Sequence, residues 1–404
     1  MDANSPGRRP LDGMRVIDLS TMIAGPFCAA MLGEFGAEVI KVELPGAGDP
    51  LRQFGTPNAS GSSFNWLNEG RNKKSVTLDI RQPEGAQLLR RLIEQADVLI
   101  ENFRPGTLEK WGLGYEVLKA IRPELVLVRV SAYGQDGPYR QRPGYARVAH
   151  GFAGLTHLAG HPDGPPVVPG STALADYITG MYAALGALLA LIARQHEGAG
   201  QWVDVGLYEG IFRMLDELVP VYAATGYVRP RMGSDTVNAA PHSHYRTGDG
   251  RWVALACSSD KMWERLARVM DRMDLVSPQT FARVEQRMAR REEINAIVQE
   301  WMSRHDLDVV MARCLGGDVP IGPINTVADI FADPHFEVRG NLLHVVDPRL
   351  GEVVVPNVIP RLSATPGRVE SLGPDLGAHN REIYGTLLGL EESEMIALRD
   401  RKVI

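Results

Sequence analysis

The sequence has little cysteine and little excess charge. Its three cysteines, Cys28, Cys257 and Cys314, are far apart and form no CxxC or metal-ligand spacing. We therefore expect no disulfide framework, no metal site and a reducing, cytoplasmic compartment. A formal net charge of -6 gives no electrostatic attraction for nucleic acid or for an anionic membrane. Basic residues that serve function are expected to act locally, inside a pocket.

Long apolar segments are also scarce. The first twenty residues, MDANSPGRRPLDGMRVIDLS, contain no continuous apolar stretch and are not typical of a secretory signal. The longest apolar run, Met181 to Ala193, is shorter than the ~20 residues that a membrane-spanning helix needs. Apolar residues make up 44% and charged residues 23% of the chain, as in soluble globular proteins. The sequence therefore predicts a soluble protein without a membrane partner.

The N-terminal half alternates strand and helix patterns. The expected strands cover residues 14–20, 37–44, 75–80, 97–103 and 125–134, with helices expected at 25–36 and 83–96. This alternation predicts an α/β protein whose large, Rossmann-like domain contains a parallel, doubly wound sheet. Such sheets bind ligands beyond the carboxyl ends of their strands.

The pattern changes after residue 226. A polar loop, a hairpin around the GDG at 248–250 and several helices predict a smaller α+β domain inserted over 227–330. The tail reads as a strand pair, a proline-rich crossing segment and a closing helix. We therefore expect a large Rossmann-like domain over 1–226, a small domain over 227–330, and a linker that returns to the large domain over 331–404.

Several familiar motifs are missing. The first expected strand is followed by STMIAGPFCAAMLG, not by the G-x-G-x-x-G of dinucleotide-binding proteins, which argues against a simple NAD enzyme. The sequence also has no Walker A, HExxH or GxSxG motif.

A single acid precedes a long apolar stretch in GSTALADYITGMYAALGALLALIARQ, residues 170–195. Asp176 lies where the predicted helix begins. An aspartate at a helix start can serve as a cap, because it accepts backbone N–H groups and suits the helix dipole. It can also serve as a nucleophile held on a rigid, buried helix.

Three blocks in one order resemble class III CoA-transferases, the formyl-CoA and carnitine CoA-transferase family. They are PLDGMRVIDLSTMIAGPFCAAMLGEFGAEVIKVELPGAGDPLR, then RNKKSVTLDIRQPEGAQLLRRLIEQADVLIENFRPGTLEKWGL, then ALADYITG with GAGQWVDVGLYEG. A looser match continues through VPIGPINTVADIFADPHF. The resemblance implies an interlocked homodimer whose active site lies where two subunits meet.

The resemblance also implies a mechanism. Asp176 matches the aspartate that attacks an acyl-CoA thioester, which gives a mixed anhydride and then an aspartyl-CoA thioester. No permanently bound cofactor is implied, because the coenzyme A thioester is itself a substrate. At a helix N-terminus we expect Asp176 to stay ionised.

Seven further positions match CoA-contacting residues of the family. They are Met22, Ile23, Ala24, Lys73, Asn102, Phe103 and Lys110. A lysine suits phosphate charge, and a phenylalanine suits packing against pantetheine or adenine. The other interpretations are a solvated basic turn for Lys73, ordinary core for Phe103 and a helix surface for Lys110.

The carboxylic acid is assigned by local chemistry. Arg147 is placed to hold the distal carboxylate of a C4 or C5 dicarboxylate, with Tyr145 and Arg52 as further substrate residues, although Arg147 can equally be a surface or dimer-contact residue. The first block is most similar to members that use succinyl-CoA with malate, citramalate or mesaconate. We therefore expect CoA transfer from succinyl-CoA to L-malate or citramalate. Mesaconate, formate, oxalate and carnitine remain alternative acceptors.

Two other functions remain open. Related α-methylacyl-CoA racemases have a His-Asp pair where this chain has Tyr145 and Ala146, and His150 stands nearby but at another position. A CoA-binding sensor without turnover is the non-enzymatic alternative.

The sequence also departs from the family at ACSSDKMW, residues 256–263, which lacks the glycines of the family's lid loop. Either Ser258 and Ser259 serve the lid role, or this protein closes its site differently.

Overall fold

The computed structural model describes residues 7–404 and divides the chain into two compact units. Unit 1 extends to Thr156 and includes Val168–Gly226 and Glu337–Ile404, while unit 2 consists of His157–Val167 and Tyr227–Phe336. Unit 2 therefore contains the expected small domain, 227–330, together with the six residues that follow it. It also contains His157–Val167, a segment expected in the large domain. That segment joins unit 2 because Gly233 N donates to Gly160 O at 3.0 Å. Residues 1–6 of the expected first domain lie outside the described residues.

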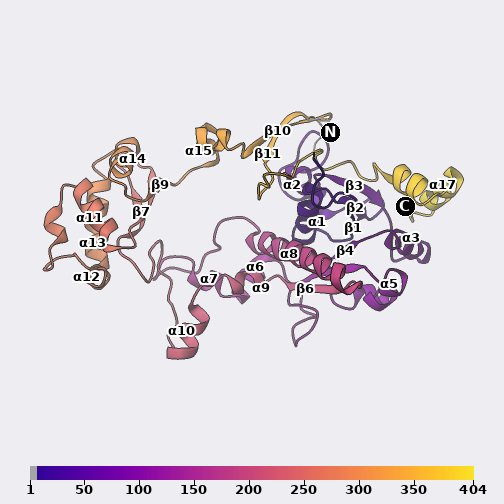
Figure 1. Ribbon diagram of the computed structural model, residues 1–404, viewed down its shortest axis with the longest axis horizontal. Coiled ribbons are helices and arrows are strands. Elements are labelled where there is room, and N and C mark those ends of the chain that lie inside the picture. The colour runs from indigo at the N-terminus through magenta and orange to yellow at the C-terminus, as the bar shows by residue number, and fades with distance from the viewer. Residues whose placement is uncertain (1–6) are drawn as a thin grey trace. The chain divides into compact units, whose positions relative to one another are not determined.

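The core of unit 1 is a six-stranded sheet in the order β3-β2-β1-β4-β5-β6, with every neighbouring pair parallel (Figure 1). This confirms the expected α/β fold, and the order 3-2-1-4-5-6 is that of doubly wound nucleotide-binding sheets. The strands are β1 (Arg15–Asp18), β2 (Glu38–Glu43), β3 (Lys73–Thr77), β4 (Val98–Glu101), β5 (Val126–Ser131) and β6 (Trp202–Gly206). The order reverses between β1 and β4, so a ligand site is expected there.

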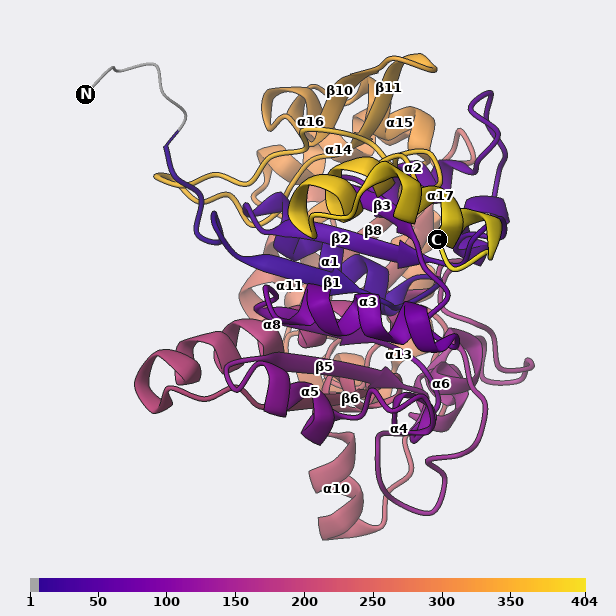
Figure 2. The same cartoon turned by 90° about the vertical axis from the view of Figure 1, so that its right-hand side faces the viewer.

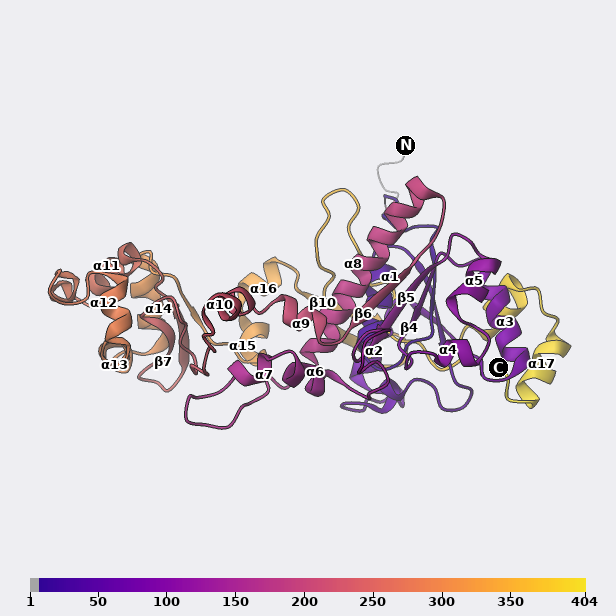
Figure 3. The same ribbon diagram turned by 90° about the horizontal axis from the view of Figure 1, so that it is seen from below.

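Helices cover both faces of this sheet (Figures 2 and 3). Apolar side chains of one face pack against α3 (Pro83–Ile93), α5 (Tyr115–Ile121), a π-helical turn (Arg381–Leu387) and α17 (Glu392–Asp400). Those of the other face pack against α1 (Ala24–Glu34), α6 (Ala146–Phe152), α8 (Leu174–Glu197) and α9 (Glu209–Arg213). Shorter helices in and near this unit are α2 (Phe64–Glu69), α4 (Thr107–Lys110), α7 (Leu155–Leu158) and α10 (Leu218–Thr225).

Helix α8 has 24 residues and packs against α1, β5 and β6. Small residues make this approach close: a Cβ added to Gly180 would lie 2.7 Å from Ala24 O and 2.9 Å from Phe27 Cδ1. By length and apolar composition α8 would also suffice to span a membrane, but half of its most apolar window is buried inside the protein, as in a core helix. Its other face exposes large apolar side chains, namely Met181, Leu185, Leu188, Leu189 and Ile192.

Unit 2 contains a three-stranded antiparallel sheet, β7-β8-β9, which includes the expected hairpin around GDG. Its strands are β7 (His242–Arg246), β8 (Trp252–Ala256) and β9 (Ile321–Pro323). Its helices are α11 (Asp260–Val269), α12 (Val284–Ala289), α13 (Arg291–Met302), α14 (Leu307–Gly316) and α15 (Val327–Ala332). Trp263 is fully buried in the core of the unit. Ser259, in the expected lid position, accepts a hydrogen bond from Met262 N and caps α11.

The tail begins with α16 (Pro334–Val338) and the antiparallel pair β10 (Leu342–Asp347) and β11 (Gly351–Pro356), which confirms the expected strand pair. It then runs back along the large sheet. Asn72 fixes this return, because its Oδ1 accepts a hydrogen bond from Glu370 N at 2.7 Å and its Nδ2 donates to Arg368 O at 2.7 Å. The chain ends in α17, beside β3 and α3.

Candidate active site

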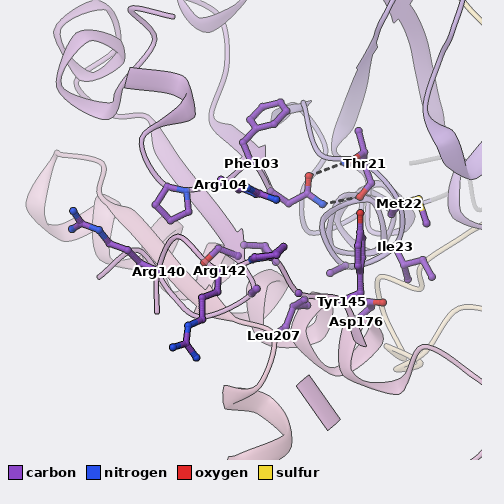
Figure 4. Close-up of a pocket in the computed structure, with 18 residues that line it drawn as sticks. Thr21, Met22, Ile23, Phe103, Arg104, Arg140, Arg142, Tyr145, Asp176 and Leu207 are labelled. Atoms are coloured by element: carbon purple, nitrogen blue, oxygen red, sulfur yellow. Dashed lines mark hydrogen bonds between the residues drawn. The ribbon is translucent and has the colours of Figure 1, made fainter. Parts of the chain in front are cut away.

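A cavity of about 200 Å³ lies at the predicted switch point, between the carboxyl ends of β1, β4 and β5 and the first turn of α8 (Figure 4). Seven residues proposed from sequence line it: Met22, Ile23, Ala24, Asn102, Phe103, Tyr145 and Asp176. We call it the Asp176 cavity. Segments that are more than 150 residues apart therefore converge here, as the doubly wound topology requires.

The turn after β1 is held on two sides. Asn102 accepts a hydrogen bond from Thr21 N at 2.9 Å and donates one to Thr21 O at 2.7 Å. Asp49 Oδ1 accepts a hydrogen bond from Met22 N at 3.0 Å. These contacts keep Met22 at φ +66°, a left-handed conformation that is costly for a residue with a side chain. The backbone of this turn is thus presented to the cavity in a fixed form.

Below the turn lies a buried network of charges. Lys41 Nζ is 3.0 Å from Asp49 Oδ2 and 3.8 Å from Asp18 Oδ1, and Lys73 Nζ is 3.0 Å from Asp18 Oδ2. Burial alone would raise the pKa of Asp18, but Lys41 and Lys73 outweigh it and keep that pKa below its ordinary value. The network also reaches the turn, since Lys41 donates to Ser20 O.

Lys73 occupies a different place from the one the family resemblance implied. Its side chain is fully buried, and Nζ donates to Asp18 and, at 2.6 Å, to Pro26 O. Burial lowers its pKa. The Lys73 side chain has no exposed surface, so in this structure it supports β1 and α1, and its contact with CoA stays a prediction.

Asp176 lies in the first turn of α8 but does not cap it. The N-cap position is Ala173, which supplies no side-chain hydrogen bond. The Asp176 carboxylate has no hydrogen-bond partner among residues 7–404. Burial, without a compensating partner, raises its pKa from 3.8 to about 6. Desolvation thus outweighs the effect of the helix dipole on this pKa, but a carboxyl with a pKa of about 6 is still mostly ionised at neutral pH.

The remaining predicted residues fall into different surroundings. Arg52 is buried and grips Glu43 at 2.7 and 2.8 Å while its guanidinium covers Trp66, so it is structural and not a substrate residue. Lys110 is exposed at the end of α4 and does not line the Asp176 cavity. Tyr145 stands at the cavity edge with 70% of its surface exposed. Arg147 is exposed and lines a separate cavity near the start of α8.

Phe103 combines two roles. It lines the Asp176 cavity and also packs edge-on against Trp111, with ring centroids 5.2 Å apart. Its contact with Trp111 confirms the core interpretation, and its place on the cavity wall leaves ligand packing as a prediction.

The chain is similar to known proteins. A family model described as CoA-transferase family III matches residues 11–380. The chain belongs to this family. Over 98% of its length it is 51% identical to the alpha and beta subunits of a succinyl-CoA–L-malate CoA-transferase of Chloroflexus aurantiacus, of which it covers 92% and 98%. It is 43% identical, over 98% of both chains, to a succinyl-CoA–D-citramalate CoA-transferase of the same organism.

A solved structure is also similar. A CaiB/BaiF family protein from Brucella suis has a TM-score of 0.84 and 36% identity, covering 94% of this chain and 100% of that one. The resemblance stated from the three sequence blocks is confirmed, and the chain is an enzyme that transfers CoA.

The sequence alone did not single out three arginines of the Asp176 cavity. Arg104, Arg140 and Arg142 all line it. Arg104 follows Asn102 by two residues, so its place after β4 was a usable signal. Arg140 and Arg142 lie in the long loop after β5, where spacing gives no such guide. Figure 4 shows the guanidinium groups of Arg140 and Arg142 directed away from Asp176, toward the outer edge of the cavity.

Proposed function

We propose that this transferase moves CoA from succinyl-CoA to L-malate or citramalate, with Asp176 as the nucleophile. The observation that carries the proposal is a half-buried carboxylate, in a cavity at the sheet's switch point, that has no hydrogen-bond partner among residues 7–404. The relatives named for succinyl-CoA with malate or citramalate support the choice of acids.

The proposed reaction needs no group beyond the substrates. The ionised Asp176 carboxylate attacks the succinyl thioester carbonyl, its C–S bond breaks, and CoA thiolate leaves a succinyl-aspartyl anhydride. The thiolate then attacks the aspartyl carbonyl, the anhydride C–O bond breaks and succinate departs. The carboxylate of malate attacks the resulting aspartyl-CoA thioester and releases the thiolate, which attacks the malyl carbonyl of the new anhydride. Malyl-CoA forms and Asp176 is restored.

The surroundings of Asp176 suit this chemistry. In water, hydrogen bonds to a carboxylate stabilise its negative charge and make it a weak nucleophile. Asp176 has lost those hydrogen bonds, which makes it more nucleophilic and also raises its pKa. The fixed Met22 turn lines the same cavity as Asp176. A thioester bound there meets the carboxylate in one orientation, which lowers the entropic part of the activation barrier.

A donor and acceptor panel tests the choice of substrates. Succinyl-CoA is offered with L-malate, citramalate, mesaconate, glutarate, formate, oxalate and carnitine, and new thioesters are measured by mass spectrometry. We expect malyl-CoA and citramalyl-CoA to form fastest. No transfer from succinyl-CoA to any C4 or C5 dicarboxylate would refute the proposal.

A racemase or a CoA sensor predicts other results. A racemase needs an acid and a base on opposite faces of an α-carbon, and no histidine stands among the described residues that line the Asp176 cavity. Deuterium exchange at C2 of a 2-methylacyl-CoA would favour the racemase. A sensor would bind CoA but give no adduct when the enzyme and succinyl-CoA are trapped with hydroxylamine.

We further propose a homodimer in a reducing, cytoplasmic setting. The exposed apolar face of α8 supports the dimer, because contiguous apolar side chains on a surface mark association sites. The buried, unpaired cysteines fit the setting. Light scattering should give twice the chain mass, and Leu189→Lys should lower it to one chain. A wild-type monomer would contradict this proposal, and a need for a second, different chain would indicate an alpha–beta assembly like that of the relatives.

A further inference from the structure

A second cavity, of about 370 Å³, lies beside the start of α8. We call it the His150 cavity. Its polar lining comes from Asn65, Arg147, His150, Ser171, Thr172 and Tyr177. No Asp or Glu lines it among the described residues. The two cavities share Ile23, and they lie against adjacent residues of α8, Asp176 for one and Tyr177 for the other. The His150 cavity is thus a neighbour of the nucleophile.

His150 is the decisive residue of this cavity. It is 1% exposed, and its Nε2 accepts a hydrogen bond from Ala175 N at 2.9 Å. Because Nε2 is the acceptor, the ring hydrogen of the neutral imidazole is on Nδ1. Nδ1 has no partner among residues 7–404. A buried donor without an acceptor is costly, so its position points to an acceptor brought by a ligand.

The other groups in the cavity favour a negative charge. The Arg147 guanidinium has no hydrogen-bond or ion-pair partner among the described residues. The hydroxyls of Ser171 and Thr172 immediately precede α8, whose 24 residues direct a positive helix end toward this region. Burial and the nearby Arg147 lower the pKa of His150, which keeps Nε2 free to accept from Ala175.

We propose that the His150 cavity binds the distal carboxylate of a dicarboxylic acid whose other carboxylate exchanges CoA with Asp176. His150 Nδ1 and the Arg147 guanidinium donate to its oxygens. This inference rests on the proposed function and deepens it, because it names the feature of the acid that is recognised. An acid with two carboxylates on a short chain fits two neighbouring cavities, of which one contains the nucleophile and the other contains hydrogen-bond donors and no carboxylate among the described residues that line it.

A rival site exists in the Asp176 cavity itself. Arg140 and Arg142 also offer positive charge, but Figure 4 shows them directed away from Asp176, toward the outer edge. That position suits the phosphates of a CoA thioester that enters from outside. The two sites therefore make opposite predictions about which substrate each arginine recognises.

The experiment compares Arg147→Met with the matched variant Arg142→Met. Calorimetry measures binding of free succinate, of butyrate as a monocarboxylate of the same length, and of free CoA. We expect R147M to weaken succinate on the order of 10- to 100-fold while leaving butyrate and CoA unchanged. We expect R142M to leave succinate unchanged.

His150 variants separate recognition from folding. Glutamine can accept from Ala175 N and also donate an N–H, so His150→Gln should retain most of the succinate affinity. Leucine can do neither, so His150→Leu should lose about tenfold in succinate binding with CoA binding retained. Equal succinate binding by H150L and H150Q would remove His150 from the site.

The inference is overturned if R147M binds succinate as tightly as the wild type, or if R142M is the variant that loses it. Failure of the proposed function looks different. In that case the wild-type enzyme transfers no CoA to any dicarboxylate, whatever the calorimetry shows. A wild type that transfers CoA to malate, together with an R147M variant that prefers malate over butyrate just as strongly, would leave the function standing and refute only this site.

Discussion

Two neighbouring regions of unit 1 treat buried charge in opposite ways. Below the Met22 turn, Asp18, Lys41, Asp49 and Lys73 are enclosed and compensate one another. Asp176, in the first turn of α8, is half-buried, and His150 Nδ1, on the neighbouring helix α6, is buried; neither has a hydrogen-bond partner among residues 7–404. The pKa of Asp18 is accordingly lowered, whereas that of Asp176 is raised.

The difference separates support from chemistry. A compensated charge network fixes backbone and has no capacity left for a ligand, whereas an uncompensated group is costly in the free protein and gains its partner from a substrate. Residue type alone does not distinguish them, since both regions contain aspartates and basic residues. The following experiments act on one side of this comparison at a time.

The largest expected effect is on turnover. Asp176→Ala removes the nucleophile, so CoA transfer should fall by on the order of 10⁴-fold. CoA binding should persist, because the Met22 turn is held by Asn102 and Asp49 instead. Steady-state transfer and calorimetry with free CoA check the two halves. Substantial residual transfer would refute the role of Asp176.

The next effect is on stability. Lys41→Met leaves Asp18 and Asp49 buried with reduced compensation, so the free energy of unfolding should fall by about 3–5 kcal/mol. Lys74→Met is the matched control: Lys74 is on the same strand as Lys73 but 32% exposed, and its ion pairs with Glu38 and Glu382 contribute less than about 1 kcal/mol. Urea unfolding of both variants measures the difference. Similar losses would show that the buried network is no more important than the surface pairs.

The third experiment is expected to raise the free energy of unfolding instead of lowering it. Because the folded pKa of Asp176 is raised from 3.8 to about 6, its ionised form opposes folding at neutral pH. Asp176→Asn should therefore stabilise the inactive protein by up to about 2–3 kcal/mol at pH 7. The gain should shrink as the pH falls toward 4, where the wild-type carboxyl is itself protonated. Asp163→Asn, in an exposed loop, should change nothing, and a D176N variant no more stable than the wild type would contradict the desolvated state.

The smallest effect is the pH dependence of the first chemical step. Only ionised Asp176 attacks, so formation of the aspartyl-CoA adduct should fall about tenfold per pH unit below pH 6. Trapping the adduct with hydroxylamine in single-turnover experiments avoids titration of the acceptor acid. Asp18, whose pKa is lowered, should stay ionised through this range, so unfolding at the same pH would not explain the loss. A rate that is flat between pH 5 and 7 would rule out the raised pKa.

Much of the fold was predictable because it depends on local patterns. Alternating apolar strands and helices predicted the parallel sheet, and GDG predicted the β7–β8 hairpin. The segment 157–167 was misassigned because its partner, Gly233, lies in unit 2 and leaves no signal in local periodicity.

The site was predictable only where chemistry is tied to a motif. Asp176, Met22 and Asn102 reach the cavity because each follows a strand end or begins a helix. Lys73 and Arg52 look like surface cations in sequence, and their burial depends on acids at Asp18 and Glu43 that no spacing rule connects to them. Lys41, inside the apolar strand EVIKVEL, was a usable sign in the sequence, because a lysine in a buried strand needs a buried acid as its partner.

The close contact at Gly180 has a consequence for how such an enzyme changes over time. The α1 backbone at Ala24 and the Phe27 ring leave no room for a side chain on α8 at Gly180, so this glycine limits the spacing between the turn after β1 and Asp176. Side chains that line the two cavities can be exchanged one by one without altering that spacing. Substitutions in the cavities can therefore change which acid the protein accepts without altering the geometry of the reaction at the thioester.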